Sequence, residues 1–105
     1  MICCCIIYPR TATSRFDVDY YVNKHMPMTL RLLRPALKGA TVETGVASTV
    51  EGQPPAHAAV CRLLFDSIDA FMSAFAPHAA TLQGDIANYT DAAPIIQFNE
   101  VKISK

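Results

Sequence analysis

Residues 16–37 read FDVDYYVNKHMPMTLRLLRPAL and carry the clearest helix start in the chain. Asp17 can act as the N-cap, because its carboxylate can accept a hydrogen bond from a free backbone amide of the first turn. Phe16 before it and Tyr21 after it have the spacing of a hydrophobic staple. We therefore expect a helix that begins at Asp17 and ends near Leu37.

One stripe of this helix combines a histidine with apolar residues. Tyr21, His25, Met28 and Leu32 recur at helical spacing and share one side of the helix. Pro27 cannot donate a backbone hydrogen bond and should bend the helix close to the imidazole. A titratable ring beside a kink makes His25 a candidate functional residue. The alternative is a hydrogen-bonded histidine in the core.

Length and composition indicate one domain, residues 1–105, that assembles as a homodimer. Apolar residues make up 51% of the chain and charged residues 17%, which is a low charge content for a small monomer. A subunit interface would bury the surplus apolar surface. Nine basic and nine acidic residues cancel and no basic run occurs, which argues against a nucleic-acid binder.

The sequence also argues against a membrane protein. No apolar stretch reaches the ~20 residues that a membrane-spanning helix needs. The apolar run at residues 2–8 is too short for a signal-peptide core, and no basic residue precedes it. We therefore expect a cytoplasmic protein with neither a membrane nor a nucleic acid as partner.

The four cysteines have the spacing of neither a disulfide framework nor a zinc site. Cys3 to Cys5 are consecutive, so neighbouring thiols would point to opposite faces of a strand, and Cys61 stands alone. The three histidines are scattered singly. We expect buried thiols that act as small hydrophobic side chains, and no metal site.

The remaining elements give the order strand, helix, strand, strand, helix, strand. Strands are expected at 2–8, 39–50, 58–65 and 94–103, with Gly45 marking a bulge or an edge and a bulge near Asn99. A second helix should start after Asp66 or Ser67 and break near Pro77, and residues 85–89 should add one further turn. This order predicts an α+β, ferredoxin-like βαββαβ fold with a four-stranded antiparallel sheet and both helices on one face. Two such sheets, packed through their uncovered faces, would form a dimeric α+β barrel.

The motif FDxDYYxxKHMP at residues 16–27 resembles the signature of the EthD-like family, a branch of the dimeric α+β-barrel superfamily. Weaker similarities extend over nearly the whole chain. The resemblance implies a homodimer with a cofactor-free pocket between helices and sheet, and relatives that act on small, often aromatic or lactone-like metabolites. The family takes its name from a protein of ether degradation, and related barrels include monooxygenases, cyclases and lactone isomerases. His25 is the motif position with an implied functional role.

Our first hypothesis is an enzyme of a catabolic pathway, with cofactor-independent isomerase, cyclase or monooxygenase-type chemistry. His25 would be the catalytic residue and would transfer a proton. Tyr21 and Tyr8 would contact the substrate. Arg62, in the middle of a predicted strand, would hold a substrate carboxylate or a developing enolate.

Each of these side chains also has a structural alternative. Tyr21 can be only the staple partner of the preceding phenylalanine, and Tyr8 can be an interface aromatic. Arg62 can pair with Glu100 or with an acid of the other subunit. The second hypothesis is therefore a non-catalytic protein that binds a small-molecule ligand, and the third is a structural role. An open cavity on which His25, a tyrosine and Arg62 converge would favour the first two.

Overall fold

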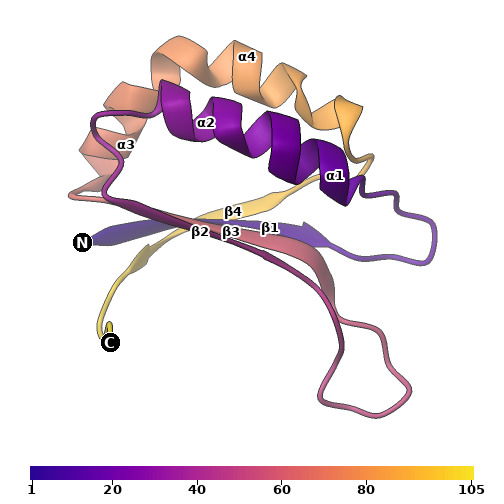
Figure 1. The fold of residues 1–105 in the computed structure, drawn as a ribbon. Coiled ribbons are helices and arrows are strands. Elements are labelled where there is room, and N and C mark those ends of the chain that lie inside the picture. The colour runs from indigo at the N-terminus through magenta and orange to yellow at the C-terminus, as the bar shows by residue number, and fades with distance from the viewer.

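The computed structural model describes residues 1–105 and has the predicted βαββαβ order (Figure 1). In chain order the elements are β1 (Ile2–Pro9), α1 (Val18–Tyr20), η1 (Tyr21–His25), α2 (Met26–Leu32), β2 (Gly39–Thr44), β3 (His57–Phe65), α3 (Ile68–Phe75), η2 (Ala76–His78), α4 (Ala79–Gly84), η3 (Ile86–Asn88) and β4 (Ile95–Glu100). None of these helices is long and apolar enough to cross a membrane.

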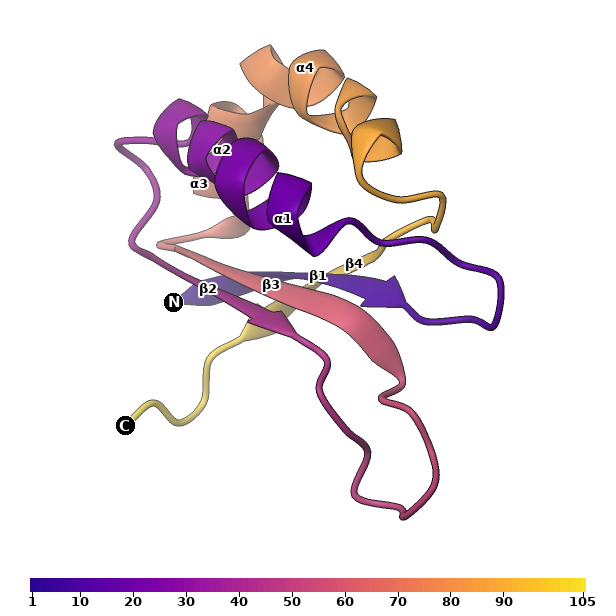
Figure 2. The ribbon, with the colours of Figure 1, turned by 45° about the vertical axis from the view of Figure 1, so that its right-hand side comes forward.

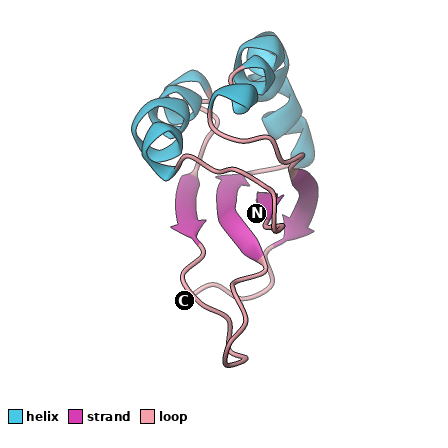
Figure 3. Cartoon of the chain, turned by 90° about the vertical axis from the view of Figure 1, so that its right-hand side faces the viewer, coloured by secondary structure: helices cyan, strands magenta, loops and turns pink.

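The four strands form one antiparallel sheet in the order β2-β3-β1-β4. Both helical segments lie on the same face of this sheet, and the opposite face is uncovered in the chain (Figures 1 and 3). Figure 2 shows the two segments side by side above the strands. The predicted fold class is thus confirmed, whereas the pairing of two chains into a barrel stays a prediction.

Alternation along β1 decides which side chains face the helices. Cys4, Ile6 and Tyr8 point to the helix-covered face, where they belong to the core or pack against it. Cys3, Cys5 and Ile7 therefore point to the uncovered face. The sequence alone left this choice open, because residues 3–7 are apolar at every position.

The first helical segment begins as expected but ends earlier. The Asp17 carboxylate accepts a hydrogen bond from the Tyr20 amide at 3.1 Å, and the rings of Phe16 and Tyr21 lie 5.0 Å apart, so the N-cap and the staple are confirmed. The last helical residue is Leu32 rather than Leu37. Residues that precede a proline avoid the helical conformation, and a proline stands at position 35.

Pro27 is accommodated by a π-helical turn. In η1 the Met26 amide donates to the Tyr21 carbonyl, one residue further back than in an α-helix. Pro27 then occupies the first turn of α2, where a missing amide is tolerated. The expected distortion is therefore an inserted wide turn, and it lies directly at His25.

The second helical segment follows the prediction closely. Ser67 is the N-cap, and its hydroxyl accepts from the Ala70 amide at 3.0 Å. Pro77 lies in the short 3-10 turn η2 that separates α3 from α4. The further turn expected at residues 85–89 is η3, and it is followed by the buried Tyr89.

Two strand predictions need correction. The second strand ends at Thr44 rather than near residue 50, and the chain then leaves the sheet in a long loop (Figure 1). The fourth strand spans Ile95–Glu100, and its pairing with β1 is regular, so the bulge expected near Asn99 is absent. Gln97 and Asn99 both point to the uncovered face, where the amide of Gln97 donates to Asn99 at 2.7 Å. The register shift lies instead at Tyr8 and Pro9 of β1.

Candidate functional site

An apolar cavity of about 220 Å³ lies between the helices and the sheet. β1, β3, both helical segments and the β4 region contribute its walls. Most of the lining is aliphatic or aromatic, and the polar side chains are few. The lining residues are Cys4, Ile6, Tyr8, His25, Thr29, Leu33, Leu63, Phe71, Met72, Phe75, Leu82, Gln83, Ile86, Pro94 and Ile96.

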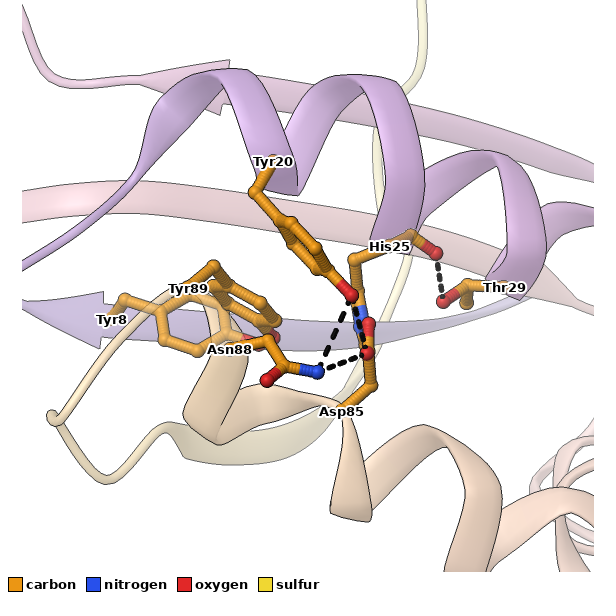
Figure 4. A network of polar contacts seen from close by, with 7 residues as sticks. All are labelled: Tyr8, Tyr20, His25, Thr29, Asp85, Asn88 and Tyr89. Atoms are coloured by element: carbon orange, nitrogen blue, oxygen red, sulfur yellow. Dashed lines mark hydrogen bonds and ion pairs between the residues drawn. The ribbon is translucent and has the colours of Figure 1, made fainter.

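His25 is the one histidine in this wall and is held in a fixed orientation. Its side chain is only 8% exposed, and its Nδ1 lies 2.9 Å from Oδ2 of Asp85. Its backbone carbonyl accepts a hydrogen bond from the Thr29 hydroxyl at 2.9 Å (Figure 4). The imidazole also stacks on the Tyr21 ring, with centroids 5.9 Å apart. These contacts fix the position of the ring from several sides.

Asp85 is itself held by two further donors. The Tyr20 hydroxyl donates to its Oδ1 at 2.7 Å, and the Asn88 amide donates to the same oxygen at 2.9 Å (Figure 4). Partial burial raises the pKa of the Asp85 carboxyl, but the hydrogen bonds from Tyr20, Asn88 and His25 outweigh this effect, so its pKa is lowered. Asp85 is therefore ionised at neutral pH.

The ionised partner determines which nitrogen of His25 carries the proton. A carboxylate only accepts hydrogen bonds, so Nδ1 of the neutral imidazole must be the donor. Nε2 then carries the free lone pair. Nε2 makes no hydrogen bond within the chain and is not sealed from solvent, and His25 lines the cavity. His25 thus brings to the cavity wall an imidazole with one accepting nitrogen, backed by a carboxylate.

The two predicted tyrosines occupy different places. Tyr8 lines the cavity, but its hydroxyl is hydrogen-bonded to that of Tyr89, and burial raises the pKa of Tyr8 to about 12. Tyr21 is 1% exposed and does not line the cavity. Its ring packs against Phe16, Tyr8 and Tyr89, and its hydroxyl has no hydrogen-bond partner. Tyr21 therefore supports the face of the imidazole on which its ring stacks.

Arg62 does not join these residues. It pairs across the sheet with Cys5, on the face opposite the helices. Its guanidinium lies 3.7 Å from the Glu43 carboxylate, and both side chains are about half exposed. The structure therefore brings His25 and Tyr8 to one cavity and places Arg62 on the other side of the sheet. Glu100, one of the alternative partners considered for Arg62, instead has its carboxylate 3.2 Å from the ammonium nitrogen of Lys102.

The thiol in the cavity wall is not a nucleophile. Cys4 is fully buried, and burial raises its pKa to about 12, so the thiolate is scarce at neutral pH. All four cysteines are free. No group of three His, Cys, Asp or Glu side chains has an arrangement that could hold a metal ion.

Sequence reasoning missed the partner of His25. Asp85 and His25 are 60 residues apart, and nothing in either local pattern links them. Asp85 follows directly after Gly84, which ends α4, and so looked like an ordinary loop residue. The sequence does contain one weak indication of a site near Asp85. The spacing of Asp85, Asn88 and Tyr89 places three polar or aromatic side chains on one short turn.

A ferredoxin-like fold with a histidine–aspartate pair beside an apolar cavity between helices and sheet defines the class of this protein. The family model described as the EthD domain matches residues 10–93. The chain therefore belongs to the EthD family, as its helix motif predicted.

Two crystal structures are similar to the chain. An EthD-like protein from Ralstonia eutropha is 43% identical, with a TM-score of 0.94 over 99% of this chain and 94% of that one. An ethyl tert-butyl ether D (EthD) family protein from Bacillus halodurans is 15% identical, with a TM-score of 0.75 over 97% of this chain and 99% of that one, which shows the shared fold. A comparison with curated proteins finds no match.

Proposed function

We propose that the protein binds a small apolar, aromatic or lactone-like metabolite in the cavity and transforms it by proton transfer at His25, as a step of a catabolic pathway. The observation that supports this most directly is the His25–Asp85 pair at 2.9 Å, whose second ring nitrogen is left free at an apolar cavity. A histidine buried only for packing has no need of an ionised partner held by two further donors.

The proposed step needs no cofactor. Nε2 of His25 takes a proton from an acidic C–H or O–H of the ligand, and the bonding electrons stay on the ligand as an enolate or phenolate. The resulting imidazolium is stabilised by Asp85 through the Nδ1–H hydrogen bond. Return of the proton to another ligand atom gives an isomer, so atoms and electrons balance.

A non-catalytic binding protein is the second candidate. The cavity offers few hydrogen-bond donors, because the hydroxyls of Thr29 and Tyr8 are already engaged within the chain. A binder requires the apolar walls but no transfer of a proton. The two functions therefore differ in whether bound ligand exchanges its acidic hydrogen.

Deuterium exchange separates the two functions. Angelica lactone has an acidic ring C–H next to its carbonyl, and incubation in heavy water with the protein should introduce deuterium and shift the double bond, as observed by NMR. His25→Asn should slow this exchange about tenfold or more, while the free energy of unfolding falls by no more than about 1–2 kcal/mol.

His57→Asn is the matched control, because His57 is exposed and lies outside the cavity. It should leave the exchange rate unchanged. Binding of the lactone without any exchange above the buffer rate would favour the binding protein. A His25→Asn variant that is strongly destabilised but whose folded fraction exchanges hydrogen at the unaltered rate would show that the imidazole is only a core residue.

A further inference from the structure

The walls of the cavity carry no permanent charge. None of the fifteen lining residues is Lys, Arg, Asp or Glu. The one arginine expected to hold a substrate carboxylate, Arg62, lies on the opposite face of the sheet and is paired with Glu43. An anion that entered the cavity would therefore lose its hydration shell without gaining a cation.

The His25–Asp85 pair does not supply the missing cation. When the imidazole is neutral, the pair carries the negative charge of Asp85, which repels an anion. When the imidazole is protonated, Asp85 at 2.9 Å neutralises it. At neutral pH, where Asp85 is ionised, the pair thus has a net charge of minus one or zero. Neither protonation state of the imidazole supplies the net positive charge that would offset the desolvation of a carboxylate.

The polar atoms available to a ligand are also few. The Thr29 hydroxyl donates to the His25 carbonyl, and the Tyr8 hydroxyl is bonded to Tyr89. What remains is Nε2 of His25 and the side-chain amide of Gln83, an exposed residue at the edge of the cavity. Two such groups match a ligand with one polar edge.

The size of the cavity limits the part of a ligand that it can enclose. A purely apolar cavity of about 150 Å³ is large enough for benzene. The cavity of about 220 Å³ found here has room for one aromatic ring with a small fused or attached group.

We infer that the cavity selects an uncharged, one-ring ligand with a single polar edge, and rejects the carboxylate form of the same skeleton. This inference rests on the proposed function, in that it takes the cavity to be the ligand site. It narrows the substrate class to neutral phenols, ketones and closed lactones, and excludes ring-opened hydroxy acids. A lactone substrate would therefore have to be supplied in its closed form by the preceding reaction.

A matched pair of probes tests the inference. Phthalide and its ring-opened product, ortho-hydroxymethylbenzoate, share one carbon skeleton but differ in charge. Calorimetric titration at neutral pH should give a dissociation constant for phthalide at least about tenfold lower than that for the acid. Equal or tighter binding of the acid, or no binding of phthalide at millimolar concentration, would overturn the inference.

A charge placed at the cavity edge provides the second measurement. Gln83→Arg should strengthen binding of the acid and so narrow the gap between the dissociation constants of the two probes. Gln53→Arg carries the same change in the exposed loop between β2 and β3, outside the cavity, and should leave the gap as it is. A gap that stays wide in Gln83→Arg would contradict the inference.

These measurements are independent of turnover. A protein that prefers phthalide but exchanges no hydrogen would refute proton transfer at His25 and leave the selectivity standing. A protein that exchanges hydrogen in a lactone yet binds the acid equally well would refute the selectivity alone.

Discussion

At the scale of single residues, Asp85 should determine part of the protein's stability in acid. Its pKa lies below the ordinary value of 3.8 because Tyr20, Asn88 and His25 donate to it. A group whose pKa is lowered by folding stabilises the folded state fully above its unfolded pKa. This contribution is lost as the pH falls from about 3.8 through the lower folded pKa.

Asp85→Asn should therefore remove an acid-sensitive part of the stability. The free energies of unfolding of the two proteins should differ most near neutral pH and converge as the pH approaches about 2. Urea titrations over this range measure both. Asp69→Asn, the same change at an exposed position on α3, is the control. A difference that stays constant with pH would show that Asp85 is not ionised in the folded protein.

The thiols should be unreactive while the protein is folded. All four are buried, and burial raises the pKa of Cys4 and Cys61 to about 12. At pH 8 only about one part in ten thousand of such a thiol is ionised. A maleimide should label none of them in the native protein and all four in guanidinium chloride. Rapid labelling of Cys4, located by mass spectrometry of the labelled peptides, would mean that the cavity wall opens.

At the scale of elements, most local structure could be predicted because its cause is local. The Asp17 cap, the staple and the Ser67 cap each depend on residues within one turn. The end of β2 and the regularity of β4 could not be predicted, since they depend on backbone pairing with a neighbouring strand that is distant in the sequence. The same limit applies to the site, where His25 was identified from its own helix but Asp85 was not.

Gly45, the residue directly after the end of β2, leads to a prediction. A Cβ on Gly45 would clash with the backbone carbonyl oxygen of His57, so the strand or the loop would have to shift. Gly45→Ala should lower the free energy of unfolding by about 1–3 kcal/mol. Gly84→Ala is the control, because a Cβ there meets nothing and Gly84 ends a helix. It should raise stability by about 0.4–1 kcal/mol in the same urea titration. Equal effects would contradict the steric explanation.

At the scale of the whole molecule, the arrangement of layers followed from the order of elements, but its completion by a second chain stays a prediction. The extent of the domain, residues 1–105, also stays a prediction. The uncovered face carries Ile7, Val60, Leu64 and Ile95 beside the Arg62–Glu43 pair. Figure 3 shows both helical segments on the other side of the sheet.

We expect a homodimer in which this face is buried. Ile95 is 52% exposed in the single chain and points to the uncovered face, so a charge there would be trapped in the interface. Ile95→Lys should shift the sedimentation equilibrium at micromolar concentration from dimer toward monomer. Ile103→Lys is the matched control, since Ile103 is 85% exposed and lies beyond the sheet, and it should sediment as the unaltered protein does. If the unaltered chain is a monomer, or if both variants stay dimeric, then the subunits do not meet through this face, and Arg62 belongs to the free surface of the protein.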